Sequence, residues 1–537
     1  MVSFADIAMG VRFVSRLPSF LRHPLTLKEA WQVLRERLER READFLVIVR
    51  RAVYEHPGSP YRDLLKLAGC EYGDLERLVS QDGVEGALCT LFRHGVYLTV
   101  DEFKGRRPVV RGSTTIAADP GQLRNPYAAA HVPAQTSGSR GAASPMLISL
   151  AFIRDRAVDS ALVLDAQGGA NWLHADSGVP GAGGLAYFLE FSSFGAPPVR
   201  WFSLVDPAAP RLHPRYRWSG RALLWGSLLA GVSLPRPEFV SPDGPLPIVR
   251  WMVEVLRSGH TPMLHAFPSL AARVCLAASD AGLDLHGAQF MLSGEPTTDA
   301  RLRVVRQAGA QALPRYSSTE CGPIGYGCLA PESADDAHLL DDLHALIQPG
   351  PRSTEAGPAP AALLISSLRL TAPLILLNVA LGDQAMVMRR ACGCPLERLG
   401  WTTHLHTIRS YEKLTSGGMT FLDTDVIRVL EEVLPARFGG APTDYQLLED
   451  EADDGSPRLR LLVHPAVGPL DTEAVSETFL SAIGAGSGVE RVMALLWRDA
   501  GLLRVERRAP LTTATGKILH LHTNRRSSER RSPGSRT

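Results

Sequence analysis

A short polar segment near the middle of the chain brings several chemically capable residue types together. The segment RYSSTECGPIG, residues 315–325, contains a tyrosine, three further hydroxyl side chains, a carboxylate and a thiol. Its glycines and Pro323 disfavour a helix, and its polar run is too long for a buried strand. Glu320 offers the oxygen ligands that Mg²⁺ prefers, Thr319 can donate to a phosphate oxygen, and the ring of Tyr316 can lie flat on a purine. We therefore expect a rigid loop that holds a nucleotide and its metal ion.

Two further segments suit the binding of a phosphorylated ligand. QTSGSRGAAS, residues 135–144, is rich in small residues and hydroxyls, so its N–H groups can converge on an anion. A flexible linker has a similar composition, so both interpretations stay open. PLTTATGKILH, residues 510–520, places Lys517 near the C-terminal end of the chain.

Two more segments follow strand-like runs. LSGEPTT, residues 292–298, comes directly after the apolar run AQFM. In LGDQAMVMRR, residues 381–390, Asp383 stands where an apolar strand is expected to end. A carboxylate at that position is well placed to accept hydrogen bonds from two ribose hydroxyls.

Length and composition narrow the class of protein. With 537 residues the chain is too long for one compact core, and its 57 basic against 56 acidic residues argue against a dedicated nucleic-acid binder. No apolar run approaches the roughly 18 to 20 residues of a membrane span. The first residues lack the pattern of a signal peptide and favour a surface helix, with a membrane-surface helix as the alternative. Seven cysteines in so long a chain make a disulfide framework improbable, so we expect a cytoplasmic protein.

The order of the expected elements indicates an α/β protein with two domains. Residues 27–110 read as helical, residues 112–144 as loop, and strand-like and helical runs then alternate to about residue 385. After residue 409 two helices, a hairpin and further strands indicate a small α+β unit. We expect a large wound domain with a small β subdomain over residues 1–408, a mobile lid over 409–523, and a disordered basic tail over 524–537.

The motifs TSGSRG, SGEP, YSSTE, LGD and TATGK, in this order, resemble those of the adenylate-forming superfamily, which includes acyl-CoA synthetases, adenylation domains and luciferases. Each motif is weak alone, and five in the right order are specific together. The resemblance runs from about residue 55 to 523. Its nearest branch is that of phenylacetate–CoA ligases and acyl-protein synthetases, which SPYRDLLKLAG at residues 59–69 and CGCP at residues 392–395 resemble.

The resemblance implies a role for each matched residue. Lys517 would contact the carboxylate and the α-phosphate, Glu320 would bind Mg²⁺, and Thr319 would touch the α-phosphate. IRSYEKL, residues 408–414, resembles the segment on which the small domain pivots, with Glu412 at the hinge. The other implied ATP-binding residues are Thr136, Ser137, Gly138 and Ser139 at the phosphates, Gly294, Glu295, Pro296 and Tyr316 at the adenine, and Asp383 and Arg409 at the ribose.

The implied activity is ATP-dependent activation of a carboxylic acid to an acyl-adenylate with release of pyrophosphate. The acyl group would then pass to a thiol, that of coenzyme A in the first instance or that of a carrier protein as a variant. One departure supports another alternative. The family's phosphate loop usually has a lysine shortly after its glycines, where this chain reads GAASPM with Arg140 inside the loop. A non-catalytic nucleotide-binding descendant that acts as an interaction protein is the alternative.

Three cysteines and a histidine follow the polar segment at spacings that a metal site can use. Cys392 and Cys394 form a C-x-C pair, and Cys328 and His338 lie upstream. Three thiolates and one imidazole make a closed tetrahedral zinc site, and the resembled branch carries such a site at this position. His344 is the competing fourth ligand, and reduced free cysteines are the alternative.

The other reactive side chains are ambiguous or structural. His265, in HTPMLHAFPS, either faces the pocket for the acid or is a buried structural histidine. We expect Cys321 to pack rather than to react, and the three cysteines in apolar surroundings to belong to the core, namely Cys70, Cys89 and Cys275.

Overall fold

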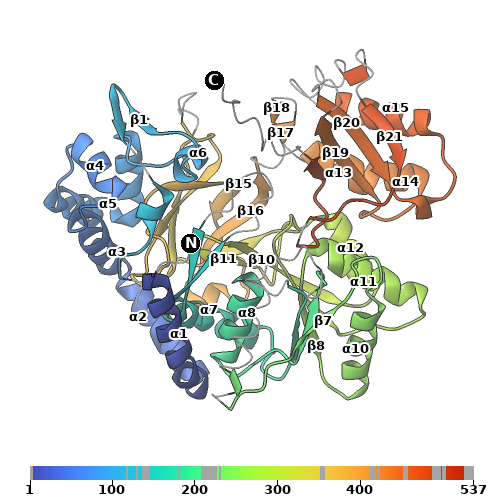
Figure 1. The fold of residues 1–537 in the computed structure, drawn as a ribbon, viewed down its shortest axis with the longest axis horizontal. Coiled ribbons are helices and arrows are strands. Elements are labelled where there is room, and N and C mark those ends of the chain that lie inside the picture. The colour runs from blue at the N-terminus through green and yellow to red at the C-terminus, as the bar shows by residue number, and fades with distance from the viewer. Residues whose placement is uncertain are drawn as a thin grey trace, which may run out of the picture. The chain divides into compact units, whose positions relative to one another are not determined.

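The computed structural model describes residues 4–116, 119–127, 131–135, 145–178, 182–206, 227–228, 231–350, 357–411, 415–416, 419–420, 424–451, 457–485, 497–498, 503–513 and 515–524. The chain divides into two compact units, Met1–Arg409 and Ser410–Thr537 (Figure 1). The division falls beside the boundary expected at residue 409. The expected α/β class is confirmed by the helices and strands of both units.

A twelve-stranded mixed sheet forms the frame of the first unit. Its strands are β5 (Leu173–Asp176), β6 (Arg200–Ser203), β7 (Pro237–Phe239), β8 (Pro262–Ala266), β9 (Gln289–Leu292), β10 (Gln311–Ser318), β11 (Gly322–Gly327), β12 (Ala337–Leu339), β13 (His344–Ile347), β14 (Ala362–Ser367), β15 (Val379–Arg389) and β16 (Thr403–Ser410). The order is β13-β14-β15-β16-β12-β11-β10-β9-β8-β5-β6-β7. At one end of this order, neighbouring strands pair in parallel along the run β10-β9-β8-β5-β6-β7. Strand β10 pairs with its other neighbour, β11, in antiparallel fashion. The expected β subdomain is therefore not a separate sheet, because its strands belong to the same sheet as the parallel strands of the wound domain.

The parallel strands are covered on both faces, which explains why their sequences are short apolar runs. Leu264 of β8 and Phe290 of β9 pack in one core with helices α10, α11 and α12 (Figure 1). The preceding and following residues, Met263 and Met291, point the other way and pack in a second core with α2, α7 and α8. The bounds of these helices are α2 Leu27–Glu39, α7 Leu150–Ala166, α8 Ala182–Ser192, α10 Leu246–Arg257, α11 Pro268–Asp280 and α12 Asp299–Gln307.

The helical character expected for residues 27–110 is confirmed, and the first helix of the chain packs one face against the core. Helix α1 (Phe4–Arg22) buries Phe13, Leu17 and Leu21 against Phe188 and other apolar residues. These three positions lie four residues apart, on one face of the helix. The other faces carry exposed residues such as Arg12, Arg16 and Ser19, so α1 is a surface helix with one face packed on the core. The remaining elements of this region are α3 (Arg41–Val49), η1 (Arg50–Tyr54), α4 (Pro60–Leu67), α5 (Tyr72–Arg93) and α6 (Val100–Phe103).

Two local expectations need correction. The stretch at residues 112–144, expected as loop, contains β2 (Thr114–Ile116) and β3 (His131–Gln135), which pair with neighbours β1 (Val109–Arg111) and β4 (Pro145–Ser149). The apolar run at residues 373–381, expected as strand, becomes strand only at Val379. Hydrophobicity alone did not separate a buried loop from a strand.

The second unit has a four-stranded sheet in the order β21-β20-β19-β22. The predicted hairpin and both predicted helices are present, and Asp471 caps the second helix through the N–H groups of Glu473 and Ala474. The elements are β17 (Thr415–Ser416), β18 (Met419–Thr420), α13 (Thr424–Arg428), η4 (Val429–Val433), α14 (Leu434–Phe438), β19 (Tyr445–Glu451), β20 (Pro457–Val463), α15 (Thr472–Gly484), β21 (Leu503–Arg507) and β22 (Leu521–Asn524). In the described parts of both units, no helix has the length and apolar character needed to cross a membrane.

Candidate nucleotide site and metal centre

The polar segment from which the sequence analysis began forms the hairpin of β10 and β11. Tyr316 lies on β10, and Thr319 and Glu320 lie in the turn that follows. The register shifts between Tyr316 and Ser317, which re-aims the side chains after the shift. The expectation of an irregular loop is therefore only partly right, because the first polar residues belong to a half-buried strand.

A buried ion cluster braces this hairpin. Glu190 on α8 accepts a hydrogen bond from Arg315 on β10, with 2.5 Å between Nη2 and Oε1, and also pairs with Arg156 on α7. Arg156 packs against the hairpin turn, since a Cβ at Gly322 would lie 3.1 Å from its Cδ. Burial alone raises the pKa of Glu190, but the charges of Arg156 and Arg315 outweigh it and hold the pKa at about 2. The permanently charged carboxylate thus fixes the strand that carries Tyr316.

Tyr316, expected at the adenine, and Asp383, expected at the ribose, contact each other. The hydroxyl of Tyr316 donates to Oδ2 of Asp383 on β15 at 3.0 Å. Burial, together with the charge of Asp383, raises the pKa of Tyr316, so its hydroxyl stays protonated as a donor. Asp383 follows Gly382, whose φ is +104°, and lies inside β15 rather than at the end of a strand as expected. Gly382 supplies the backbone conformation that a residue with a Cβ resists.

Glu320 lies close enough to this pair to interact with it electrostatically. Burial raises the pKa of Glu320, and the negative charge of Asp383 acts in the same direction. The ammonium of Lys104 and the hydroxyl of Ser318 act in the opposite direction. Two carboxylates that share a partly dehydrated site are a suitable environment for a divalent cation, which would relieve their mutual repulsion. Exposed Thr319 lies next to Glu320 in the same turn.

Next to this hairpin in the sheet, the segment Gly294–Pro296 follows β9. Gly294 is exposed and has a φ of +82°. Glu295 turns inward: its carboxylate accepts from the N–H and the hydroxyl of Ser269 at 3.0 and 2.9 Å and pairs with Arg301 at 2.7 Å. Its side chain has no solvent exposure, so a contact from this residue to an adenine would have to come from its backbone. Half-buried Pro296 follows it.

Arg409, expected at the ribose, is held by a protein carboxylate. Its Nη1 lies 2.8 Å from Oδ2 of Asp335. The same carboxylate accepts from the N–H of Thr407 through Oδ1 at 2.9 Å and from the N–H of Ile408 through Oδ2 at 2.7 Å. Thr407 has a φ of +55°, a costly conformation for a β-branched residue. Asp335 therefore fixes the end of β16. Sequence reasoning missed it, because one aspartate in the polar run ESADD carries no distinguishing pattern.

Part of the expected site lies outside the described residues. This applies to the phosphate-loop residues Thr136, Ser137, Gly138 and Ser139, and to the hinge residue Glu412.

In the second unit, Lys517 ends a tight turn. The N–H of Lys517 donates to the hydroxyl of Thr513 at 3.1 Å, and the carbonyl of Lys517 accepts from the N–H of Thr513 at 2.8 Å. Gly516, with a φ of +86°, permits this turn. The lysine side chain is half-buried.

Gln446 forms hydrogen bonds to the residues on both sides of the turn that carries Lys517, namely Leu511 and Leu519. Its amide donates to the carbonyls of Leu511 and Leu519 at 3.0 and 2.7 Å and accepts from the N–H of Leu511 at 2.6 Å. The side chain is fully buried on β19. This residue was also missed, although a single glutamine inside the apolar run DYQLL is a signal of a buried polar role.

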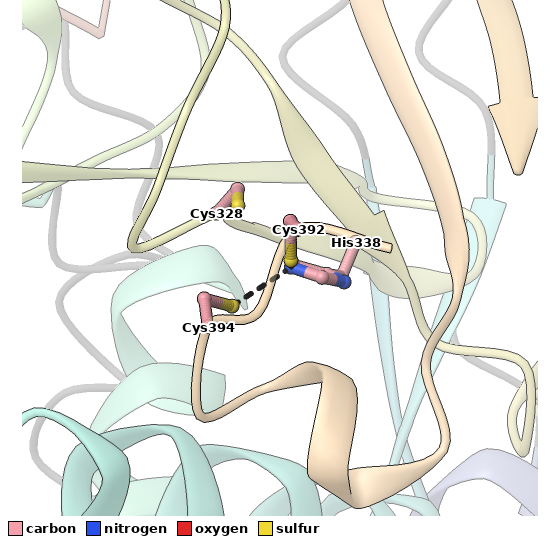
Figure 2. A group of neighbouring side chains, drawn as sticks. All are labelled: Cys328, His338, Cys392 and Cys394. Carbon is pink, nitrogen blue, oxygen red and sulfur yellow. Dashed lines mark hydrogen bonds between the residues drawn. The ribbon is translucent and has the colours of Figure 1, made fainter. Parts of the chain in front are cut away.

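Cys328, His338, Cys392 and Cys394 converge from three segments of the first unit. Their ligand atoms all lie within 4.8 Å of one another, and Figure 2 shows the side chains pointing toward a common centre. Nε2 of His338 lies 3.2 Å from Sγ of Cys394. His344, the competing ligand, instead bonds through Nε2 to the carbonyl of Pro323 at 2.8 Å. The donor set and its geometry fit a closed tetrahedral zinc site.

The surroundings of this cluster orient its ligands. Nδ1 of His338 bonds to the carbonyl of Trp401 at 2.7 Å, so it carries the hydrogen and leaves Nε2 to face the thiols. Burial raises the pKa of Cys394, but the backbone N–H groups of Leu329 and Glu397 outweigh it and lower the pKa. The lowered pKa favours the thiolate form of Cys394, which is the form that binds a metal ion.

Cys321 behaves as the sequence suggested. Burial raises the pKa of its thiol to about 12, and its Sγ lies 3.2 Å from the hydroxyl of Ser318. Such a thiol is unreactive at neutral pH. Cys70 and Cys275 are buried in the core, and Cys89 is half-buried.

Comparison with known proteins finds likeness only among solved structures. No family model matches the chain, and no curated protein matches it. A 2-hydroxyisobutyryl-CoA ligase in complex with 2-HIB-AMP and CoA is 16% identical over 93% of this chain and 89% of its own, with a TM-score of 0.45. O-succinylbenzoate coenzyme A synthetase from Bacillus subtilis, with ATP and magnesium, is 15% identical over 77% and 71%, with a TM-score of 0.42. An anthranilate CoA ligase in complex with anthranoyl-AMP is 14% identical over 78% and 68%, with a TM-score of 0.44. At these identities and scores the likeness assigns no activity to this chain.

Proposed function

We propose that this protein activates a carboxylic acid with ATP and Mg²⁺, forms an acyl-adenylate and pyrophosphate, and transfers the acyl group to the thiol of coenzyme A. The observation that supports this most strongly is the direct contact of Tyr316 with Asp383 beside Glu320. It brings together the residues proposed as stacking ring, ribose acceptor and Mg²⁺ ligand, which come from two distant motifs. The five ordered sequence motifs add to it.

In the adenylation step, a carboxylate oxygen of the substrate attacks the α-phosphorus, and pyrophosphate leaves. Mg²⁺, when bound, would neutralise charge on the phosphate oxygens. Glu320 would hold this ion, and Asp383 would accept from the ribose hydroxyls. Lys517 would donate to the substrate carboxylate and the α-phosphate, where negative charge accumulates in the transition state.

In the second step, the thiol sulfur attacks the acyl carbonyl, and AMP leaves with the bonding electrons. Lys517 would take no part in this step, so a mobile small domain would withdraw it and admit the thiol. A phosphopantetheine on a carrier protein presents the same thiol as coenzyme A. A cytoplasmic location suits this chemistry, because thiol acceptors and the free cysteines of this chain stay reduced there.

We also propose that Cys328, His338, Cys392 and Cys394 bind one structural Zn²⁺. Four protein ligands would leave no open coordination position, so the ion would stabilise the fold and take no part in the reaction. It would tie the loop after β11 to the loop after β15, the strand that carries Asp383.

The test is pyrophosphate release from ATP and Mg²⁺ with a panel of carboxylic acids, using wild type and Lys517→Ala. We expect acid-dependent release that falls by a factor of about 100 or more in the variant. Lys66→Ala, which removes an exposed lysine from α4, is the matched control and should retain the activity. Adding coenzyme A or a carrier protein to the wild-type reaction then distinguishes the two acceptors.

A non-catalytic nucleotide-binding role is the second candidate, and the lysine-free stretch GAASPM supports it. In that case ATP would bind, but pyrophosphate release would be at background and equal in wild type and Lys517→Ala. This outcome would contradict the enzymatic proposal.

A further inference from the structure

Outside the expected nucleotide contacts, an aspartate, a histidine and a serine form a linear hydrogen-bonded relay. Oδ1 of Asp176 lies 2.8 Å from Nδ1 of His265, and Nε2 of the same histidine lies 2.8 Å from the hydroxyl of Ser293. The histidine therefore bridges a carboxylate and a hydroxyl through its two different ring nitrogens. This is the arrangement that activates a serine as a nucleophile in several unrelated folds.

The topology of the sheet places the three residues. Strands β5, β8 and β9 are adjacent and parallel, and Asp176, His265 and Ser293 lie at or directly after their carboxyl ends. The register pairs Asp176 with His265, and the N–H of Ser293 donates to the carbonyl of Ala266 at 3.1 Å. Ligands of open parallel sheets bind at this edge, so the relay stands where a substrate is expected.

The hydrogen-bond pattern sets the proton positions that base catalysis needs. A carboxylate can only accept, so Asp176 holds the hydrogen of the imidazole on Nδ1. Nε2 then carries the free lone pair, and the hydroxyl of Ser293 donates to it. Deprotonation of Ser293 by His265 requires no tautomer change.

The ring is held in this orientation from its other sides. Tyr187 stacks on His265 with ring centroids 4.3 Å apart and an angle of 8° between the planes. The carbonyl of His265 accepts from the N–H and the hydroxyl of Ser177 at 3.0 and 2.7 Å. A rotamer change of the histidine would break the stacking contact and both side-chain hydrogen bonds, so the relay is fixed before any ligand arrives.

The acid of the relay is buried, and the histidine and the serine are partly exposed. The side chain of Asp176 is 1% exposed and that of His265 is 19% exposed, and Ser293 is partly exposed. Gly294 follows the serine with a φ of +82°, so the chain turns directly after Ser293, which itself follows the last residue of β9. Ser293 is therefore not sealed in the core, which a nucleophile that must meet a substrate requires.

We propose that Ser293, His265 and Asp176 form an acyl-transfer centre that accepts activated acyl groups such as esters, thioesters or acyl phosphates. The Ser293 oxygen forms a bond to the acyl carbon, its proton moves to Nε2 of His265, and the bond to the leaving group breaks as that proton passes to it. Water then attacks the acyl-serine by the same route, which releases the acid and restores the serine. This activity requires no ATP and is independent of the function proposed above.

The experiment uses the full chain and p-nitrophenyl acetate without nucleotide. We expect a burst of p-nitrophenol close to the enzyme concentration, an acetylated peptide containing Ser293 in mass spectra of quenched enzyme, and stoichiometric labelling of Ser293 by a fluorophosphonate. His265→Gln should lower the acylation rate by a factor of about 100 or more, and Asp176→Asn should lower it as well. Ser279→Ala, which removes an exposed serine from α11, is the matched control and should react as wild type.

Ser293→Ala should abolish both the burst and the label. If this variant is unfolded, fluorophosphonate labelling of folded wild type, mapped by peptide, decides the question. A label on another residue, the absence of any label, or an equal burst in wild type and His265→Gln would overturn the proposal.

Discussion

The hydroxyl of Tyr316 donates a hydrogen bond to Asp383, which lies 67 positions further along the chain, at 3.0 Å. One residue comes from the strand that begins the polar hairpin and the other from the middle of β15. The contact holds the tyrosine ring in one position beside the carboxylate. A pre-positioned ring and carboxylate lower the entropy cost of binding a nucleoside.

Removing either partner of this contact should weaken the binding of ATP. We expect Asp383→Ala to raise the KM for ATP about 10- to 100-fold, because hydrogen bonds to a charged group are worth roughly 1.5 to 3 kcal/mol. Tyr316→Phe keeps the ring and should cost only about 1 kcal/mol. Steady-state kinetics over a range of ATP concentrations measures both effects, with Tyr127→Phe at an exposed site as control. Strict additivity in the double variant would contradict coupling of the two residues.

Gln446 should matter for adenylation without touching a substrate. Gln446→Leu keeps the volume and removes three hydrogen bonds that hold the turn of Lys517. We expect kcat for pyrophosphate release to fall about 10-fold, with a smaller change in the KM for ATP, because the lysine is less well positioned. In a Lys517→Ala background the same change should have little further effect. A full additional loss in that background would assign Gln446 a separate role.

The cysteine–histidine cluster should contain zinc in the purified protein. We expect about one Zn²⁺ per chain by elemental analysis, because the four ligands are already assembled. Cys394→Ser should lower the zinc content and the melting temperature, whereas Cys89→Ser, at a half-buried site on α5, should change neither. Prolonged chelation should reproduce the loss of stability. A zinc-free preparation that melts at the same temperature as a zinc-loaded one would contradict a structural role.

Glu190 should make the first unit sensitive to acid. Its pKa lies at about 2 against an ordinary value of 4.5, so its stabilising charge is fully present above pH 4.5 and is lost as the pH falls through 2. We expect urea unfolding to show a loss of stability between these values that is absent in Glu190→Gln. The variant should also be less stable at pH 7, by about 3 to 5 kcal/mol, because Arg156 and Arg315 lose a buried partner. Glu254→Gln, exposed on α10, is the control and should follow the wild-type pH dependence.

Local sequence patterns sufficed for many elements. The helix at Asp299–Gln307, the hairpin of Tyr445–Glu451 with Pro457–Val463, and the helix at Thr472–Gly484 all follow from apolar spacing and turn residues. These signals act over a few residues, so the sequence contains them in readable form. They failed where burial depends on distant segments, as in the run at residues 373–378, which is apolar but not a strand.

By itself the sequence determined the α/β class and which residue types were available for chemistry. Only the tertiary structure decided which of them meet. It joined Tyr316 to Asp383, turned Glu295 toward Arg301, bound Arg409 to Asp335, and selected His338 over His344 for the cysteine cluster. It also aligned Asp176, His265 and Ser293, which share no local motif. The physical reason is that secondary structure depends on neighbouring residues, whereas a site depends on the register of strands and helices that are far apart in the chain.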